Sequence, residues 1–378
     1  MTFLFLSWRD IRNPRSGGAE VYTHELIKRL VLNGHRVVHV SPRASGLERK
    51  EILDGVLYLR CGNVISVILH AAIFYLSHRR RFSYVVDQCN THQFFTPFYV
   101  EAAKRIFLIH QLTREIWKVQ APWPLKYIGA ACESSWLRLH RKDMTITVSQ
   151  STRDDLLSLG FGEGRVFIVP NGIARRAAPF ESLLPKNEPP YFVYMGRYSR
   201  YKGIDDSIRA LALLKKSVPQ ARLVLLGKPD GKYIERSLRP LCSSLSLTIG
   251  TEDGCDVFVK GFVDEDTKFD IIGRAMALLF PSMREGWGII VTEASVSGTP
   301  AIVYDSPGCR DAVDMGKAGY LCRSNSPESL AAFMQETLSG GASYQEMRYK
   351  AWDFSRQFTY EKTLGEFEAA FGRVYGAV

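Results

Sequence analysis

Short apolar runs alternate with helical patterns along the whole chain, and this alternation restricts the fold more than any other feature. In the first half, six runs have the length and composition of buried strands: 3–6, 37–40, 84–86, 106–109, 145–148 and 166–169. A helix is predicted over 19–32, ending at Asn33-Gly34, and another begins with Ser151 as its N-cap residue. Strands that alternate with helices indicate a doubly wound α/β domain.

The alternation repeats in the second half of the chain. Five more strands are predicted at 191–195, 222–226, 257–262, 277–280 and 301–303, and helices at 205–216, 266–274, 288–297 and 327–338. At 378 residues the chain is too long for one ordinary core. A Pro-rich, charged stretch at 177–190 is the predicted linker. We therefore predict an N-terminal Rossmann-like domain over 1–172, a C-terminal one over 173–355, and a final segment over 356–378.

Composition excludes several classes of protein. Hydrophobic residues make up 46% of the chain and charged residues 23%, which is typical of a globular protein and not of a disordered one. The apolar run at 1–7 has no basic residues before it and is too short for a signal peptide, so we interpret it as the first strand. The seven cysteines form no C-x-x-C pair, which indicates a reducing cytoplasm and no structural zinc.

The net charge of +10 is distributed unevenly. Residues 1–172 hold 23 Lys and Arg against 14 Asp and Glu, whereas residues 173–378 hold 26 against 25. A basic first domain favours an anionic partner, which can be a membrane surface, a phosphorylated acceptor or nucleic acid.

Residues 284–300 place two carboxylates around the predicted start of a short helix. Glu285 stands just before a Gly-Trp-Gly turn, where the backbone can leave N–H groups unpaired. Such N–H groups, together with the positive end of the helix dipole, form an anion site. Glu293 can reach the hydroxyls of a ligand whose phosphates lie at that helix start. A phosphate flanked by sugar hydroxyls describes a nucleotide sugar, and the predicted donor-binding residues here are Gly286, Trp287, Gly288, Ile289 and Glu293.

This segment resembles the E-x7-E signature of the large retaining glycosyltransferase family four, the glycosyl transferases of group 1, which contains sucrose synthases and mannosyltransferases. Trp287 stands where Phe is more usual. The resemblance implies the GT-B fold: two Rossmann-like doubly wound domains, an interdomain cleft for the ligand, and a last helix, here 361–375, that crosses back to the first domain. It also implies catalysis without a metal. No context for pyridoxal phosphate is visible, so no cofactor is expected.

A basic loop follows the first strand of the second domain. Its sequence, Gly196 to Gly203, resembles the family's G-R-x(n)-K-G motif and lies at a strand's carboxyl end, where ligands collect in such sheets. Arg197 offers a planar guanidinium and Lys202 a compact charge, and together they suit a pyrophosphate. We predict that Arg197, Lys202 and Glu285 are catalytic residues, with Glu285 holding the sugar's hydroxyls and Glu293 the nucleotide ribose.

The first domain supplies further candidates at strand ends. Gly17 and Gly18 lie at the start of the first long helix and allow a ligand to approach its N–H groups. The family carries a similar glycine pair facing the donor phosphate and the acceptor, which implies donor binding here. His110 ends the fourth predicted strand, where relatives place a histidine against the donor sugar, and it is assigned as catalytic by that resemblance.

Three more polar residues near strand ends are candidates for the acceptor site: Asp87, Asn90 and Arg114. Two other stretches of this domain are candidates for contact with its partner. Residues 63–77 are largely apolar and precede His78-Arg79-Arg80-Arg81, which fits an interfacial helix with a basic end but not a membrane span of about 20 residues. Residues 112–137 contain three of the six tryptophans, which indicates an aromatic surface of the kind found at membrane interfaces. A buried helix and a packed loop are the alternative interpretations.

Together these features predict a retaining, metal-independent glycosyltransferase that uses a nucleotide diphosphate sugar, with UDP favoured and GDP-mannose left open. The expected acceptor is lipid-linked, in polysaccharide or glycolipid synthesis, and the expected location is cytoplasmic and peripheral on the inner face of the plasma membrane. A soluble small-molecule transferase and a nucleotide-sugar epimerase are alternatives on the same fold. A nucleic-acid-binding protein is a more remote one, and it leaves the paired glutamates unexplained.

Overall fold

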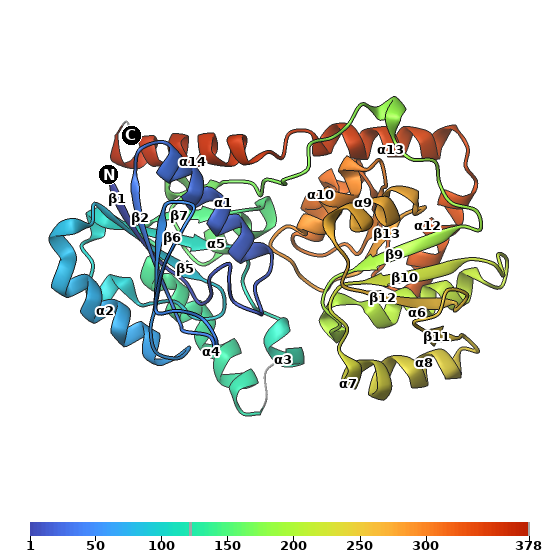
Figure 1. Ribbon diagram of the computed structural model, residues 1–378, viewed down its shortest axis with the longest axis horizontal. Coiled ribbons are helices and arrows are strands. Elements are labelled where there is room, and N and C mark those ends of the chain that lie inside the picture. Colours follow the sequence, from blue (N-terminus) through green and yellow to red (C-terminus); the bar gives the residue numbers. More distant parts are fainter. Residues whose placement is uncertain (121–122, 377–378) are drawn as a thin grey trace. The chain divides into compact units, whose positions relative to one another are not determined.

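Two largely parallel β-sheets organise the computed structural model, which describes residues 1–120 and 123–376 of the chain (Figure 1). One unit comprises Met1–Trp117, Pro122–Gly172 and Thr359–Val378. The other comprises Lys118–Ala121 and Ile173–Phe358. Each unit has its own sheet and its own buried core.

The sheet of the first unit follows the order β3-β4-β2-β1-β5-β6-β7-β8. Its strands are β1 (Thr2–Leu6), β2 (Arg36–Ser41), β3 (Lys50–Leu53), β4 (Val56–Arg60), β5 (Tyr84–Cys89), β6 (Arg105–Ile109), β7 (Met144–Thr147) and β8 (Val166–Ile168). All of its pairings are parallel except β3 with β4. That edge hairpin, which turns at Asp54 and Gly55, was not predicted.

Helices on the faces of this sheet bury one side each. They are α1 (Gly18–Leu32), α2 (Ser66–His78), α4 (Leu125–Leu137), α5 (Gln150–Ser158) and α14 (Tyr360–Tyr375), and α3 (Ile116–Gln120) lies in the loop before α4. Short 3-10 turns lie at Arg79–Arg81, Thr96–Phe98, Ala102–Lys104, Arg138–His140 and Glu163–Arg165. The predicted cap of α5 was wrong by two residues, because the hydroxyl of Ser149, not Ser151, accepts the Thr152 N–H at 3.2 Å.

The sheet of the second unit follows the order β11-β12-β10-β9-β13-β14-β15, with parallel pairs throughout. Its strands are β9 (Tyr191–Met195), β10 (Arg222–Leu226), β11 (Ile249–Gly250), β12 (Val257–Gly261), β13 (Leu278–Phe280), β14 (Ala301–Val303) and β15 (Tyr320–Leu321). The strands β9, β13 and β14 are continuous apolar runs, because strands of parallel sheets are covered on both faces.

The helices of the second unit are α6 (Ile204–Leu214), α7 (Gly231–Tyr233), α8 (Arg239–Ser244), α9 (Glu265–Arg274), α10 (Ile289–Val296), α11 (Cys309–Ala312), α12 (Pro327–Leu338) and α13 (Ala342–Ser355). Shorter elements are the 3-10 turns Phe180–Ser182, Arg200–Lys202 and Asp314–Gly316 and the π-helix Ile234–Leu238. The stretch 177–190, expected to be a linker, packs on this unit. Its Lys186 Nζ donates to Thr299 Oγ1 at 2.7 Å and to the Gly273 carbonyl at 3.0 Å.

The last helix, α14, belongs to the first unit although it follows the whole of the second in sequence. Its Phe371 packs edge-on against Phe3 and Tyr84, with ring centroids 6.0 and 4.7 Å apart. Thr363 Oγ1 donates to the Pro170 carbonyl at 2.8 Å. The chain therefore returns to the unit in which it began. Residues 377–378 of the predicted final segment lie outside the described residues.

Each sheet has one point where the strand order reverses. In the first unit the order runs outward from β1 to β2 on one side and from β5 to β6 on the other, and in the second from β9 to β10 and from β13 to β14. Ligands of doubly wound sheets bind beyond the carboxyl ends of the strands at such points. The prediction of two Rossmann-like doubly wound domains is confirmed, and these two edges are where their site residues gather.

Candidate functional site

Two loops meet at the switch point of the second unit. One follows β9 and runs over residues 196–203, and the other follows β13 and runs over 281–288. The Met283 N–H donates to the Tyr201 carbonyl at 2.9 Å. Gly203, at φ 72°, lies so close to the other loop that a methyl group on it would approach the Pro281 carbonyl oxygen to 2.2 Å. The backbone thus fixes the two loops against each other.

The side chains of Lys202 and Glu285 form an ion pair at this junction. Lys202 Nζ lies 2.5 Å from Glu285 Oε1, and the two side chains are only 14% and 11% exposed. Burial alone would lower the pKa of Lys202, but the Glu285 carboxylate and Tyr201 outweigh it and raise the pKa above its usual 10.5. The ammonium also lies 5.2 Å from the centroid of the Tyr201 ring, a favourable cation–π distance. Lys202 is therefore a permanent cation held in place.

A third loop, after β14, holds the main chain of Glu285 in place. The Glu285 N–H donates to the Pro307 carbonyl at 2.9 Å. Gly308, at φ 79°, lies against the same residue, and a methyl group there would come within 2.1 Å of the Glu285 carbonyl oxygen. Sequence reasoning missed Gly308, although the Pro-Gly turn just after a predicted strand was a usable signal.

Helix α10 begins at the end of the second loop. Its N-cap residue, Gly288, has φ 93° and ψ 64°, a conformation that favours glycine. The first N–H groups of a helix lack partners within it and carry its positive pole. The predicted anion site is this end of α10. Ile289, its first residue, is half-buried beside Phe269 and Val296.

The side chain of Trp287, which was predicted to bind the donor, is buried. Its indole is only 8% exposed, donates from Nε1 to Thr292 Oγ1 at 2.9 Å, and packs on Phe358 with ring centroids 4.9 Å apart. The side chain stabilises the loop from within the unit. Of the residues predicted to bind the donor, Trp287 and its neighbour Gly286, which is also buried, can therefore offer only main-chain groups.

Glu293 points from α10 toward α9. Its Oε1 accepts from Lys268 Nζ at 2.9 Å, and burial raises the pKa of the carboxyl although Lys268 opposes that shift. Sequence reasoning missed Lys268 because nothing in the spacing of residues 268 and 293 indicates that α9 and α10 lie together.

Among the predicted catalytic residues of the second unit, Arg197 is the exposed one. Its Nη2 donates to the Tyr201 hydroxyl at 3.3 Å, while its carbonyl accepts from Tyr194 at 2.8 Å. The main chain is fixed and the guanidinium faces solvent, so this cation can move to meet a ligand whereas Lys202 cannot.

In the first unit, Glu20 dominates the start of α1. One carboxylate oxygen accepts from the Gly17 N–H at 2.7 Å, and the other from Arg9 Nε at 3.1 Å and Asn90 Nδ2 at 3.3 Å. The carboxylate therefore occupies the helix end that was predicted to bind a donor phosphate through Gly17 and Gly18. The Gly17 N–H is unavailable to a phosphate while this bond is in place.

His110 lies at the carboxyl end of β6, as predicted. Its ring meets Tyr22 of α1 edge-on at 5.0 Å, and its Nε2 is buried without a hydrogen-bond partner. Burial lowers the pKa of His110 from 6.5 to about 4. The imidazole is therefore neutral at physiological pH and can hydrogen-bond a hydroxyl, but it cannot serve there as a cation.

The predicted acceptor residue Asp87 has no exposed surface. It is fully buried at the end of β5, where its carboxylate accepts from the main-chain N–H groups of Phe94 at 2.9 Å and Thr96 at 3.2 Å. These bonds fold the loop after β5, which is a structural role. Arg114 is half-buried; its N–H donates to Glu133 at 2.9 Å and its Nη2 lies 3.9 Å from Asp155.

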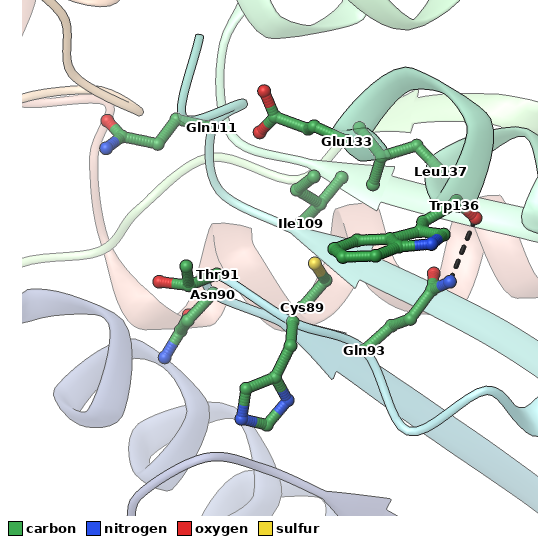
Figure 2. Close-up of a pocket in the computed structure, with 10 residues that line it drawn as sticks. Cys89, Asn90, Thr91, Gln93, Ile109, Gln111, Glu133, Trp136 and Leu137 are labelled. Atoms are coloured by element: carbon green, nitrogen blue, oxygen red, sulfur yellow. Dashed lines mark hydrogen bonds between the residues drawn. The ribbon is translucent and has the colours of Figure 1, made fainter. Parts of the chain in front are cut away.

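The three tryptophans of residues 112–137 do not form a common aromatic surface. Trp123 is 77% exposed, but Trp117 packs on Gly129 of α4, and Trp136 lines a pocket (Figure 2). The three tryptophans were predicted to form one surface because their spacing in the sequence does not show in which direction each indole points.

Two models of known families match the two halves of the chain. Residues 176–353 match the family model described as "Glycosyl transferases group 1", and residues 16–176 match "Glycosyltransferase Family 4". Glycogen synthase of Mycobacterium tuberculosis is 28% identical over 214 residues, 56% of this chain and 49% of that protein, so the chain spans about half the length of this curated relative.

Solved structures show the same fold. Sucrose-phosphate synthase from Thermosynechococcus elongatus superposes with a TM-score of 0.77 at 17% identity, covering 100% of both chains. HepE of Anabaena, solved in complex with UDP and glucose, superposes with a TM-score of 0.71 at 14% identity, covering 98% of this chain and 99% of that one.

Proposed function

Since the chain belongs to the group 1 glycosyl transferases, we propose that it transfers a sugar from a nucleoside diphosphate sugar to an acceptor hydroxyl with retention of configuration. The observation that carries this proposal is the Lys202–Glu285 ion pair beside the N-terminus of α10. It supplies a fixed cation, a carboxylate and a helix pole at one switch point, which are the groups that a sugar diphosphate requires.

In the proposed reaction, the bond between the anomeric carbon and the β-phosphate oxygen breaks while the acceptor oxygen attacks from the same face. The acceptor's proton passes to the departing phosphate oxygen. Lys202, Arg197 and the N-terminus of α10 stabilise the negative charge that develops on the phosphate. Glu285, fixed through its N–H to Pro307, accepts hydrogen bonds from the hydroxyls of the transferred sugar.

The proposed nucleotide is UDP. Its support is the fold shared with HepE, which was solved with UDP and glucose. We assign the ribose hydroxyls to Glu293, whose buried carboxylate is oriented by Lys268. GDP-sugars remain the competing donors in the test described below.

The proposed acceptor is lipid-linked and is reached at an anionic membrane surface on the cytoplasmic side. Four large aliphatic side chains form an exposed stripe along α2, with these exposed fractions: Ile65 81%, Leu69 65%, Ile73 55% and Leu76 51%. The opposite side of the helix, through Val67 and Tyr75, is buried in the core. Three exposed arginines, 79–81, follow directly and complement anionic head groups.

No helix among the described residues is both long and apolar enough to cross a bilayer. Binding through α2 would therefore use the stripe and the arginines together. Such binding weakens as salt rises, because part of it is electrostatic.

The donor and the stereochemistry are tested by one experiment. Purified protein is incubated with UDP-, GDP-, ADP- and dTDP-sugars and a polyprenyl-linked acceptor, and the product's anomeric configuration is read by NMR. A glycoside with the donor's configuration from a UDP-sugar supports the proposal. An inverted product contradicts retention, a free epimer identifies an epimerase, and product from another nucleotide alone contradicts UDP.

Membrane binding is tested by sedimentation with vesicles that contain phosphatidylglycerol. The Leu69→Ser/Ile73→Ser double variant should lose most binding, and neutralising residues 79–81 should remove its salt dependence. A matched control is Ile52→Ser, which changes an aliphatic residue that is 70% exposed on the β3 edge strand of the same unit. Wild-type binding by the α2 variant would contradict the assignment of this surface.

A further inference from the structure

Tyr201 lies in the loop after β9, directly before Lys202 in the 3-10 turn Arg200–Lys202, and is only 4% exposed. Three parts of this residue make three different contacts. The hydroxyl contacts Arg197, the ring lies beside Lys202, and the carbonyl accepts from the Met283 N–H. Tyr201 therefore connects both cations of its own loop with the loop after β13.

The hydroxyl limits the movement of Arg197. Arg197 Nη2 donates to it at 3.3 Å, and this is the one hydrogen bond of the guanidinium to the described part of the chain. The main chain of Arg197 is held separately, by the Tyr194 hydroxyl at 2.8 Å. An exposed arginine loses side-chain freedom when it binds a ligand, so a contact that restricts the guanidinium beforehand lowers the entropic cost of binding. The other N–H donors of the guanidinium stay available to a phosphate.

The ring limits the movement of Lys202. Its centroid lies 5.2 Å from Lys202 Nζ, and the centroid of Phe280, the last residue of β13, lies 5.8 Å from the same atom. A cation is attracted to the face of an aromatic ring at such distances. The rings also keep water away from the ammonium, so its attraction for a phosphate is screened less than it would be in solution.

The main chain of Tyr201 is fixed to the loop after β13. Its carbonyl accepts from the Met283 N–H at 2.9 Å. Gly203, two residues further on, is so close to the Pro281 carbonyl that a side chain would not fit. Tyr201 therefore cannot shift unless the loop that carries Glu285 shifts with it, and the places of its hydroxyl and its ring are set by both loops.

We propose that Tyr201 is a positioning residue for the diphosphate: its hydroxyl and its ring hold Arg197 and Lys202 in place relative to each other before the donor binds. This rests on the proposed function, in which both cations meet the phosphates of the donor. The donor then spends less of its binding energy on ordering the cations. Because Tyr201 acts through these cations, its effect is confined to ligands that carry phosphate.

Tyr201→Phe tests the hydroxyl, because it removes the contact with Arg197 and keeps the ring beside Lys202. Calorimetric titration of the full chain should show UDP and inorganic pyrophosphate bound about fivefold more weakly, the loss expected for one hydrogen bond to a charged group. Uridine, which has no phosphate, should bind as it does to the wild type in ligand-observed NMR.

Tyr198→Phe is the matched control. Tyr198 is a buried tyrosine of the same loop, 5% exposed, and its hydroxyl donates to the Leu225 carbonyl at 3.5 Å. Its substitution should change none of these affinities. Thermal unfolding of both variants shows that the second unit remains folded.

Arg197→Gln separates positioning from packing. If the hydroxyl acts through Arg197, Tyr201→Phe should weaken UDP binding no further in the Arg197→Gln protein, whereas a merely structural role would give the same loss in both backgrounds. Tyr201→Leu removes the ring as well and should lower kcat about tenfold, while Tyr201→Phe should mainly raise the KM for the donor.

The positioning role is overturned if Tyr201→Phe binds UDP as tightly as the wild type, or if it weakens uridine binding equally. It is also overturned if Tyr198→Phe has the same effect, or if the losses in Tyr201→Phe and Arg197→Gln add. In each of these cases, UDP binding and sugar transfer by the wild type would still support the proposed function. A wild-type protein that binds neither nucleoside diphosphates nor pyrophosphate would instead overturn the proposed function, and the positioning role with it.

Discussion

The two units share one architecture but carry different chemistry at the same point of their sheets. At the switch point of the second unit, Lys202 is paired with Glu285, and Lys268 is paired with Glu293 nearby. At the switch point of the first unit, Arg9 is likewise paired with Glu20, but two neutral groups nearby, His110 Nε2 and Gln93 Oε1, are buried without a partner. The fold determines where a ligand binds, and the residues at that edge determine what it is.

This contrast indicates a division of labour. Buried ion pairs keep cations and carboxylates in place before a ligand arrives, which suits a phosphate whose charge grows during a reaction. Neutral buried acceptors suit hydroxyls, because they gain hydrogen bonds that the ligand-free protein lacks. The eight histidines follow the same division, since all of them precede residue 141.

The largest effect is expected for Lys202. Lys202→Ala should lower kcat about 100- to 1,000-fold, because the cation nearest the departing phosphate is lost. The change also leaves the Glu285 carboxylate buried and unpaired, which destabilises the second unit by about 3–5 kcal/mol. Turnover is measured by release of the nucleotide, and stability by thermal unfolding.

Two further variants separate these effects. Lys202→Met/Glu285→Gln removes the pair as a whole, so it should regain stability without regaining activity. Lys216→Ala, an exposed lysine of the same unit, should change neither. Wild-type turnover in Lys202→Ala would remove this residue from the mechanism.

A smaller loss is expected for Gly308. Gly308→Ala brings a methyl group against the Glu285 carbonyl and should displace that residue, lowering kcat about tenfold or more because small misplacements are costly in catalysis. Gly254→Ala is the matched control: Gly254 also has a positive φ, of 131°, but has no atom within 4 Å of the added group. Equal losses in the two variants would mean that backbone strain, not displacement of Glu285, is responsible.

Buried parallel strands were the most predictable part of this fold. β9, β10 and β14 begin and end at the predicted residues, because strands covered on both faces appear as uninterrupted apolar runs. The β3–β4 hairpin was missed because its first strand, Lys50–Leu53, is half polar, although Asp54-Gly55 is a strong turn signal. An edge strand buries too few side chains for a periodic apolar pattern to show in its sequence.

The site was predictable only in part. Glu285 and Lys202 could be placed at strand ends, but their contact spans 83 positions and depends on β9 and β13 being neighbours. Lys268 gave no signal, because its role comes from helix packing. A resemblance identifies positions that a family shares, but it does not show at which of them, such as position 287, the side chain is buried.

A moderate effect is expected for Glu293. Glu293→Ala should weaken UDP binding about tenfold, the equivalent of about 1.4 kcal/mol, while kcat at saturating donor changes little. Lys268→Gln leaves the carboxylate in place and should preserve most of the affinity. Calorimetric titration with UDP measures both. If Lys268→Gln costs as much affinity as Glu293→Ala, the pair acts as a unit and the ribose assignment to Glu293 alone is wrong.

The smallest predicted effect is a loss of stability at acidic pH, which should occur in the first unit and not in the second. Burial lowers the pKa of His39 and of His110 from 6.5 to about 4. Between these values the unfolded chain binds protons that the folded unit does not, so the free energy of unfolding falls as pH falls. Each histidine should cost about 1 kcal/mol between pH 7 and pH 5.5. Hydrogen exchange resolved by peptide should show the first unit losing protection over this range.

The second unit provides the internal control, because no histidine occurs in residues 173–358. Its peptides should keep their protection at pH 5.5 if neutral buried histidines are the cause. His39→Phe removes one titrating group without adding charge, so the loss of stability per pH unit should become smaller whatever the variant's stability at pH 7. Equal acid sensitivity in both units, or an unchanged slope in His39→Phe, would assign the effect to carboxylates such as those of the ion pairs, and the contrast between the two switch points would then not extend to their response to pH.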